Sequence, residues 1–286
     1  MPSKSAPPSL REVSRICNNG GALTIGGSLV KAESNPDPSG IVVRPCTSLA
    51  EFDTCVELQK AIWRYADVDV VPSALFVVAS KSGGHVLGAF DRERMIGFAL
   101  GFAAFRGGAR YVHSHMAGVL PEYRDLGVGR RLKLLQREIC LQSGIQQVEW
   151  TFDPLELKNA HFNIVRLGVV VRKILPNLYG ITTSRLHGTL PTDRLVAEWA
   201  IASPRVEAVL AGRAAMGKRA AARVTLPANI AEMRQSDPEI AKREQSQARE
   251  EFERHFAVGL AVTGFERGEQ AASYLLEKWS ARSGSD

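Results

Sequence analysis

The sequence is short of the residues and runs that mark metal, redox or membrane proteins. Its 286 residues include only four cysteines, with no Cys-x-x-Cys pair and no histidine at the spacing of a metal ligand. No apolar run approaches the roughly 18 residues that cross a bilayer. The opening stretch MPSKSAPPSLREVSR has no apolar core of a signal peptide. We therefore expect a cytoplasmic protein with reduced, buried thiols, no metal and no membrane contact.

Basic residues outnumber acidic ones, and the formal net charge is +6. This balance suits an anionic small ligand. The basic residues are spread along the chain, however, and no run of aromatic residues alternates with them, as a single-strand binder would need. The composition therefore weighs against nucleic acid as the main partner.

The order of patterns along the chain predicts an α/β protein. Residues 1–40 are rich in Gly, Ser, Asn and Pro and predict a flexible leader, with ALTIGGSLV as a short ordered stretch. Residues 41–201 predict a strand, two helices, three antiparallel strands, a loop, and then alternating helices and strands. In residues 202–286, SDPEIAKREQSQAREEFERHF predicts a helix, and AVGLAVTGF with SYLLEKW predicts a closing hairpin.

The stretch YRDLGVGRRL, residues 123–132, follows a strand pattern and precedes an amphipathic helix pattern. A glycine turn at the start of a helix presents several backbone N–H groups to an anion, and Gly127 and Gly129 let the backbone approach it closely. The Walker pattern is absent, and a dinucleotide fingerprint fails because position 132 is Leu rather than a third Gly. Taken alone, such a stretch is more often a plain strand-to-helix turn than a phosphate site.

In its context, this stretch resembles the signature loop of the GNAT superfamily of acyl-CoA-dependent N-acyltransferases. The pattern Arg/Gln-x-x-Gly-x-Gly/Ala is met by Arg124, Gly127 and Gly129, after the stretch VLPEY. NAHFNIVRLG is similar to the family's second motif, and the order of elements over residues 41–195 agrees with the family. FNIVRLGVVVRKILPNLYG, with the later DRLVAEW, is similar to a subgroup of long, poorly characterised predicted acetyltransferases, some of which act in N-acylamino acid metabolism.

The resemblance implies a fold with a mixed, mostly antiparallel twisted sheet flanked by helices. Residues 41–201 would form the acyl-CoA-binding catalytic domain, and residues 202–286 a C-terminal extension of helix and hairpin.

The resemblance also implies where acyl-CoA would bind. Loop amides would hold the pyrophosphate of coenzyme A, and the strand before the loop would bond the pantetheine arm through its main chain. An Asn early in the second helix would lie near that arm, although the same residue could be a helix cap. The implied cofactor-binding residues are Ala117, Gly118, Val119, Arg124, Asp125, Leu126, Gly127, Val128, Gly129, Arg130 and Asn159.

The implied reaction is the attack of a neutral amine on the thioester. It needs a base for the ammonium proton, stabilisation of the developing oxyanion and an acid for the leaving thiolate. Many family members supply the acid from a Tyr in the second helix, but that position is Ile164 here. Tyr179 is a candidate substitute, although a packing role fits it as well.

For the base, YVHSHM places His113 and His115 on one face of the strand that enters the loop, and an imidazole accepts a proton near neutral pH. Glu149 and Asp153, on the strand expected to splay from it, could take the same proton or hold the substrate ammonium. Two hydrogen-bonded sheet histidines are the competing interpretation. The sequence alone does not rank these four candidates for the base.

We therefore expect an enzyme that moves an acetyl or other small acyl group from acyl-CoA to a primary amine of a small molecule, with an amino acid among the candidates and a homodimer as a further expectation. The alternative is a non-catalytic CoA-binding or interaction module, because the usual Tyr is missing. A nucleic-acid-associated protein would instead show binding that weakens steeply with salt.

Overall fold

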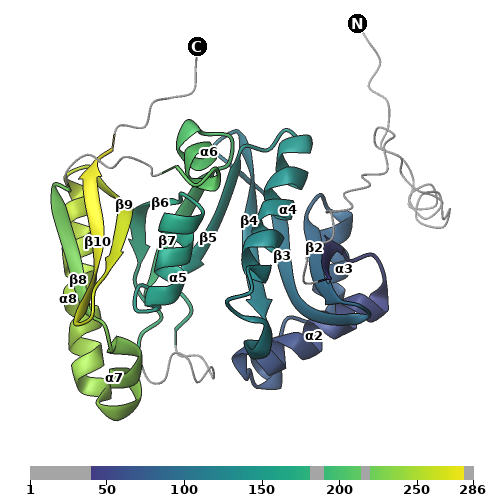
Figure 1. The fold of residues 1–286 in the computed structure, drawn as a ribbon, viewed down its shortest axis with the longest axis horizontal. Coiled ribbons are helices and arrows are strands. Elements are labelled where there is room, and N and C mark those ends of the chain that lie inside the picture. The colour runs from purple at the N-terminus through teal and green to yellow at the C-terminus, as the bar shows by residue number, and fades with distance from the viewer. Residues whose placement is uncertain (1–39, 181–189, 214–219, 280–286) are drawn as a thin grey trace, which may run out of the picture. The chain divides into compact units, whose positions relative to one another are not determined.

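The computed structural model describes residues 40–180, 190–213 and 220–279. Except for Gly40, the predicted leader lies outside the described residues, as does Cys17. The described chain alternates strands and helices around one sheet (Figure 1). The elements are β1 (Ile41–Pro45), α2 (Leu49–Trp63), η1 (Asp67–Asp69), α3 (Ser73–Lys81), β2 (His85–Asp91), β3 (Arg94–Arg106), β4 (Ala109–Val119), η2 (Pro121–Tyr123), α4 (Val128–Gln142), β5 (Gln147–Phe152), α5 (Leu157–His161), η3 (Phe162–Arg166), β6 (Val170–Leu175), β7 (Arg194–Ala200), α6 (Pro204–Leu210), β8 (Ala222–Pro227), α7 (Ile230–Ser236), α8 (Pro238–Ala257), β9 (Leu260–Arg267) and β10 (Ala271–Lys278).

The sheet has ten strands in the order β1-β2-β3-β4-β5-β7-β6-β9-β10-β8. Among the described strands, β4 and β5 are the one parallel pair, and the other neighbours run antiparallel. The predicted mixed, mostly antiparallel α/β fold is confirmed. β6 bonds β9 at Val171 and Val262, so the C-terminal strands continue this sheet. A domain boundary at residue 201 stays a prediction.

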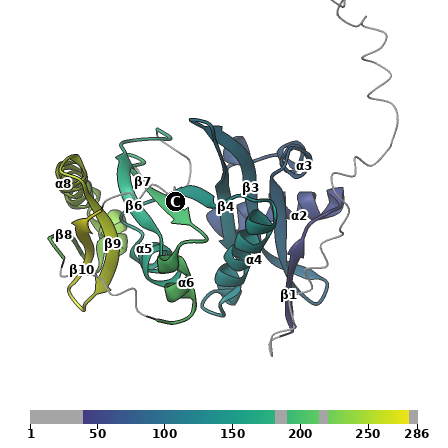
Figure 2. The ribbon, with the colours of Figure 1, turned by 90° about the horizontal axis from the view of Figure 1, so that it is seen from above.

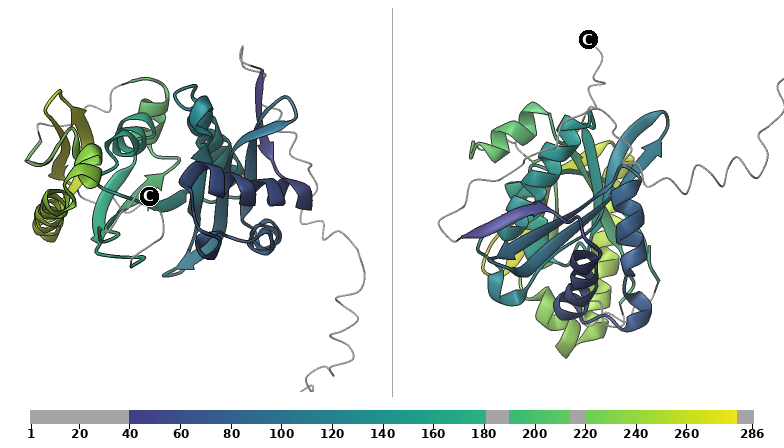
Figure 3. Two further views of the ribbon diagram at one scale, coloured as in Figure 1. Left: turned by 90° about the horizontal axis from the view of Figure 1, so that it is seen from below. Right: turned by 90° about the vertical axis from the view of Figure 1, so that its right-hand side faces the viewer.

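Helices cover both faces of the sheet around β4 (Figures 2 and 3). A Cβ added to Gly118 would meet the ring of Trp63 on α2, whereas the Ser114 hydroxyl faces Lys133 on α4. α2 begins with a capping box in which Ser48 and Glu51 bond each other's backbone, which satisfies two donors of the first turn. None of the helices in the described ranges combines the length and apolar content that a membrane crossing requires.

Three features depart from the elements expected from the sequence. The second motif is a five-residue helix, α5, followed by the π-helical turn η3, where the Leu167 N–H bonds the Phe162 carbonyl five residues back. The strand β8 and the short helices α6 and α7 were not predicted at all. The C-terminal helix and hairpin are present as α8, β9 and β10, and the Asp237 side chain caps α8.

Candidate functional site

The strands β4 and β5 separate soon after they meet. They are paired only at Val112 with Val148 and at His113 with Glu149, although β4 continues to Val119 (Figure 1). On its other edge, β4 stays bonded to β3 through to its end. The β5-facing peptide groups of the second half of β4 therefore have no ladder partner among the described strands, and they can bond a ligand.

A β-bulge marks the point of separation. Leu100 of β3 is opposite Met116 of β4, whereas Gly101 is opposite Ser114, so His115 is the extra residue. A bulge bends the strand and redirects the side chains beside it. The bend therefore occurs at the histidine pair that the sequence analysis singled out.

The N-terminus of α4 is open to an anion. Gly127 is its N-cap at φ 75°, in the left-handed region that favours glycine, and no side chain caps the helix. The first helical bond runs from the Arg131 N–H to the Gly127 carbonyl, so the N–H groups of the preceding residues have no partner within the helix. A Cβ added to Gly129 would meet nothing closer than Val119, at 4.0 Å. These observations fit a phosphate group or another anion.

The arginines around this loop point in different directions. Arg124 is exposed, and its Nε donates to the Val119 carbonyl at 3.3 Å, which ties the loop to the end of β4. Arg130 donates to the Leu210 carbonyl of α6 at 3.1 Å, and Arg131 donates to the Ile41 carbonyl of β1 at 2.6 Å. Arg124 is therefore the arginine best placed to meet a loop-bound anion.

The structure brings the remaining predicted contact residues together only in part. The second half of β4, which is no longer paired with β5, carries Ala117, Gly118 and Val119. The loop residues Asp125, Leu126 and Val128 follow them closely in the chain. Asn159 is exposed on α5, and its carbonyl accepts the Phe162 N–H. Its side chain has no hydrogen bond to the loop within the described part of the chain, so its role stays a prediction.

The two histidines lie close together on β4. Their ring centroids are 6.0 Å apart, and His115 also contacts Phe102 of β3 at 5.6 Å. Burial lowers the pKa of His113, helped by the charges of Lys133 and Arg106. His115 is exposed at the surface, yet desolvation by its neighbours and the proximity of His113 lower its pKa as well. Both rings are therefore neutral at pH 7 and able to accept a proton.

The two acidic candidates have different environments. Glu149 faces His113 across the strands and accepts from Arg106 at 2.9 Å, and Arg106 also donates to the Tyr111 hydroxyl at 2.8 Å. Asp153 is buried beside Arg234 at 2.5 Å and Arg194 at 3.6 Å. Asp153 is thus part of a buried ion-pair cluster, which leaves Glu149 as the acid placed beside the histidines.

Two phenols lie near the same face. The Tyr179 hydroxyl is 3.2 Å from the Thr151 hydroxyl, and Thr151 shares a face of β5 with Glu149. Burial raises the pKa of Tyr65, and Tyr179 and Arg194 are among the groups that act on it. Sequence reasoning missed Tyr65, because it follows α2 in a segment with no motif. Ile164 is buried and contributes no acid.

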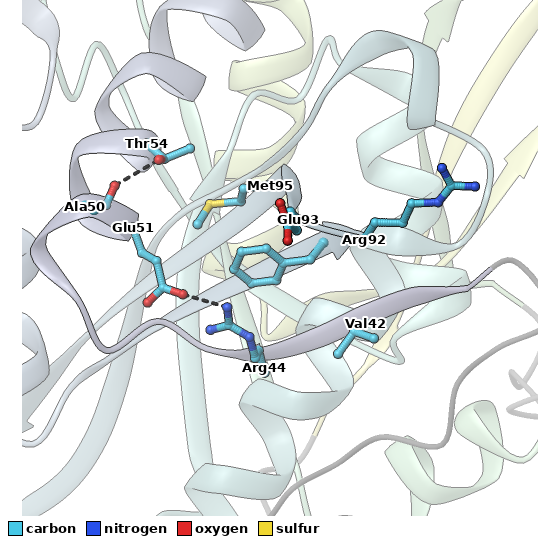
Figure 4. A pocket seen from close by; sticks show the side chains of 9 residues that line it. Val42, Arg44, Ala50, Glu51, Thr54, Arg92, Glu93 and Met95 are labelled. Atoms are coloured by element: carbon cyan, nitrogen blue, oxygen red, sulfur yellow. Dashed lines mark hydrogen bonds and ion pairs between the residues drawn. The ribbon is translucent and has the colours of Figure 1, made fainter.

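A surface hollow lies away from these residues. It is formed by β1, α2 and the β2–β3 turn, with Arg44, Glu51 and Phe90 among its lining side chains (Figure 4). Arg44 is bonded to Glu51 at 2.7 Å and lies over the Phe90 ring at 4.0 Å, so its charge already has partners.

In the described ranges, no three His, Cys, Asp or Glu side chains gather to hold a metal ion.

Comparison with known proteins gives one family match, over part of the chain. Residues 52–163 match the model of the acetyltransferase (GNAT) family. No curated protein sequence matches the chain.

Solved structures that the chain resembles include an acetyltransferase of Salmonella typhimurium with its cofactor acetyl-CoA, at 18% identity and a TM-score of 0.45, over 57% of this chain and 97% of that one. The ribosomal-protein-alanine N-acetyltransferase of Escherichia coli aligns at 12% identity and a TM-score of 0.46, over 57% and 95%. A structure from Desulfovibrio desulfuricans, described as an acetyltransferase of the GNAT family, aligns at 14% identity and a TM-score of 0.46, over 57% and 99%.

The family predicted from the loop and the second motif is thus confirmed. Residues 52–163 extend from α2, through the β4 bulge and the open start of α4, into η3. The match to the GNAT acetyltransferase family thus covers this segment of the chain.

Proposed function

We propose that the protein is an acyl-CoA-dependent N-acyltransferase, which moves an acetyl or other small acyl group to a primary amine of a small molecule. The observation that carries the proposal is the pairing of β4 and β5 at only two positions, beside an uncapped α4 N-terminus. Free strand amides and free helix amides are adjacent there, which suits the pantetheine arm and the pyrophosphate of one CoA molecule.

In this proposal the loop and β4 hold acyl-CoA through their main chains. The N–H groups of Val128, Gly129 and Arg130 would bond the pyrophosphate, with Arg124 adding positive charge. The peptide groups of residues 117–119 would bond the pantetheine amides in place of a strand partner.

The transfer requires removal of the ammonium proton, stabilisation of the developing oxyanion and protonation of the leaving thiolate. The neutral amine attacks the thioester carbonyl carbon, the C–S bond breaks, and the thiolate leaves with a proton. His113, paired with Glu149 across the strands, is our first choice to accept the ammonium proton, and His115 is the second. Tyr179 is our candidate to protonate the thiolate, with Tyr65 near it.

The surface around Glu149, where we place the amine acceptor, presents both signs of charge. Glu149 can hold a substrate ammonium, and the exposed Arg106 guanidinium beside it can hold a carboxylate. An α-amino acid carries both groups on one carbon. This ion pair therefore favours an amino acid over an amine that carries no carboxylate as the acceptor.

Binding is tested by thermal unfolding with saturating acetyl-CoA and, separately, succinyl-CoA. A ligand that binds the folded state raises the melting temperature by mass action. No shift with either donor would contradict the proposal. Replacing Gly127 and Gly129 together by Val should abolish the shift, and an unchanged CoA affinity would show that the loop is only a turn.

A second candidate function rests on Ile164, since its buried side chain gives no acid to the second motif. A CoA-binding module without transfer would show the melting shift but release no thiol. A screen of acyl donors against amines, with detection of free CoA thiol, separates the two functions. Thiol release with an amino acid supports our proposal, and binding without release across the whole panel supports the module.

A further inference from the structure

A lysine of α4 is buried against the sheet, at the point where β4 and β5 separate. Lys133 is 4% exposed, on a helix whose other basic residues reach the surface or distant carbonyls. No carboxylate lies within ion-pair distance of its ammonium in the described ranges. A buried cation without a carboxylate is costly, so the fold must hold it by other means.

The ammonium of Lys133 contacts both separating strands. Its Nζ donates to the Ser114 hydroxyl of β4 at 2.7 Å and lies 3.8 Å from the ring centroid of Trp150 on β5. Each of these residues directly follows the last paired residue of its strand, His113 and Glu149 respectively. Lys133 therefore contacts, on each strand, the first residue beyond the β4–β5 pairing.

Neighbouring side chains hold the partners of this contact in place, Gln136 and His85 near Lys133 and Trp199 beside Trp150. Lys133 also donates to the Gln136 side-chain oxygen at 3.0 Å, which orients the Gln136 amide group to donate to His85 on β2 at 2.7 Å. His85 accepts this bond because burial and the Lys133 charge lower its pKa to about 4. On the other side, Trp150 packs edge-on against Trp199 at 5.9 Å.

We propose that Lys133 is a positioning residue that fixes the separation of β4 and β5, through Ser114 on one strand and Trp150 on the other, at the width that acyl-CoA requires. This inference rests on the proposed function, in which acyl-CoA lies between these strands. In this proposal Lys133 does not touch the substrate, because its side chain is buried.

The titratable groups that face Lys133 also suggest an effect on the histidine pair. His113 of β4, His85 of β2 and Cys140 of α4 all interact with its charge. The Lys133 charge helps to keep the pKa of His113 low. Removing this charge should raise that pKa, because the protonated His113 ring would no longer be repelled by a nearby cation.

The test is calorimetric titration of acetyl-CoA into the wild type and into Lys133→Met, which keeps the length of the side chain without its charge. We expect the Kd for acetyl-CoA to rise about tenfold or more, since a misplaced binding surface loses its preorganised contacts. NMR titration should show the His113 ring protonating at higher pH in the variant. Ser114→Ala, which removes only the contact to β4, should weaken binding in the same direction.

The matched control is Phe252→Leu, a buried position on α8. It packs against Tyr274 of β10, which is five strands away from β4 in the sheet order. It should lower the melting temperature and leave the Kd unchanged. A folded Lys133→Met with wild-type Kd and wild-type His113 titration would overturn the inference alone. If Lys133→Met does not fold, a wild-type Kd in Ser114→Ala overturns it. A wild type that binds no CoA overturns the proposed function as well.

Discussion

Lys133 and His85 are two buried basic side chains that share one hydrogen-bonded chain through Gln136. Burial lowers the pKa of Lys133 to about 7, and burial together with the Lys133 charge lowers that of His85 to about 4. Their protonation therefore differs between the folded and unfolded chains, and the stability of the fold must respond to pH.

For Lys133, the unfolded side chain keeps its proton up to a pKa of about 10.4. From about pH 7 to that value, the unfolded chain binds a proton that the folded chain lacks, so stability rises with pH, by up to about 1.4 kcal/mol per unit from this group. Below pH 7 the whole penalty of the buried charge remains. Lys133→Met should thus gain stability relative to the wild type most at pH 6 and least at pH 9. Urea unfolding at three pH values checks this, and a constant difference would contradict it.

At the scale of elements, the start of α4 combines two glycines with different local demands. Gly127 needs its positive φ, whereas Gly129 lies within the first turn of the helix, where the backbone suits any residue. Nothing in the free protein forces glycine at position 129, since an added Cβ would be 4.0 Å from Val119. A ligand lying over the first turn would explain the missing side chain.

Gly129→Ala should therefore change stability and binding in opposite directions. Alanine in a helix is favoured over glycine by up to about 1 kcal/mol, so the melting temperature of the free protein should rise. The Kd for acetyl-CoA should rise too, because the new methyl group lies where the pyrophosphate approaches the backbone. Higher stability with unchanged affinity would mean that no ligand approaches this turn.

The sequence predicted these elements where the signal was local. The glycine loop and the closing hairpin are read from neighbouring residues, and the structure has the same elements there. Lys133 and Gln136 were missed because helical periodicity assigns polar residues to the solvent face. The bulge at His115 was missed because strand register depends on the partner strand.

At the scale of the whole described fold, the C-terminal strands are tied to the end of β5. Tyr274 of β10 donates to the Pro154 carbonyl at 2.6 Å, and Arg234 of α7 bonds the buried Asp153 at 2.5 Å. These contacts join residues far apart in the sequence, so no local pattern revealed them. They indicate that the extension stabilises the strand that carries Glu149.

Arg234→Met should accordingly destabilise the protein by about 3 kcal/mol or more, because it leaves the Asp153 carboxylate buried with one fewer cation. Replacing both partners, with Asp153→Asn and Arg234→Met together, should restore part of the loss. Chemical denaturation of the two single variants and the double variant measures the coupling. Additive losses would show that the pair contributes no mutual stabilisation.

The most direct test of the account is amide hydrogen exchange with and without saturating acetyl-CoA. The account predicts slower exchange in two segments, residues 117–119 of β4 and residues 125–130 of the loop and first turn of α4. In the first segment the β5-facing N–H groups would bond the ligand, and in the second the N–H groups that open the helix would do so. Acetyl-CoA that binds while leaving both segments unprotected would contradict it.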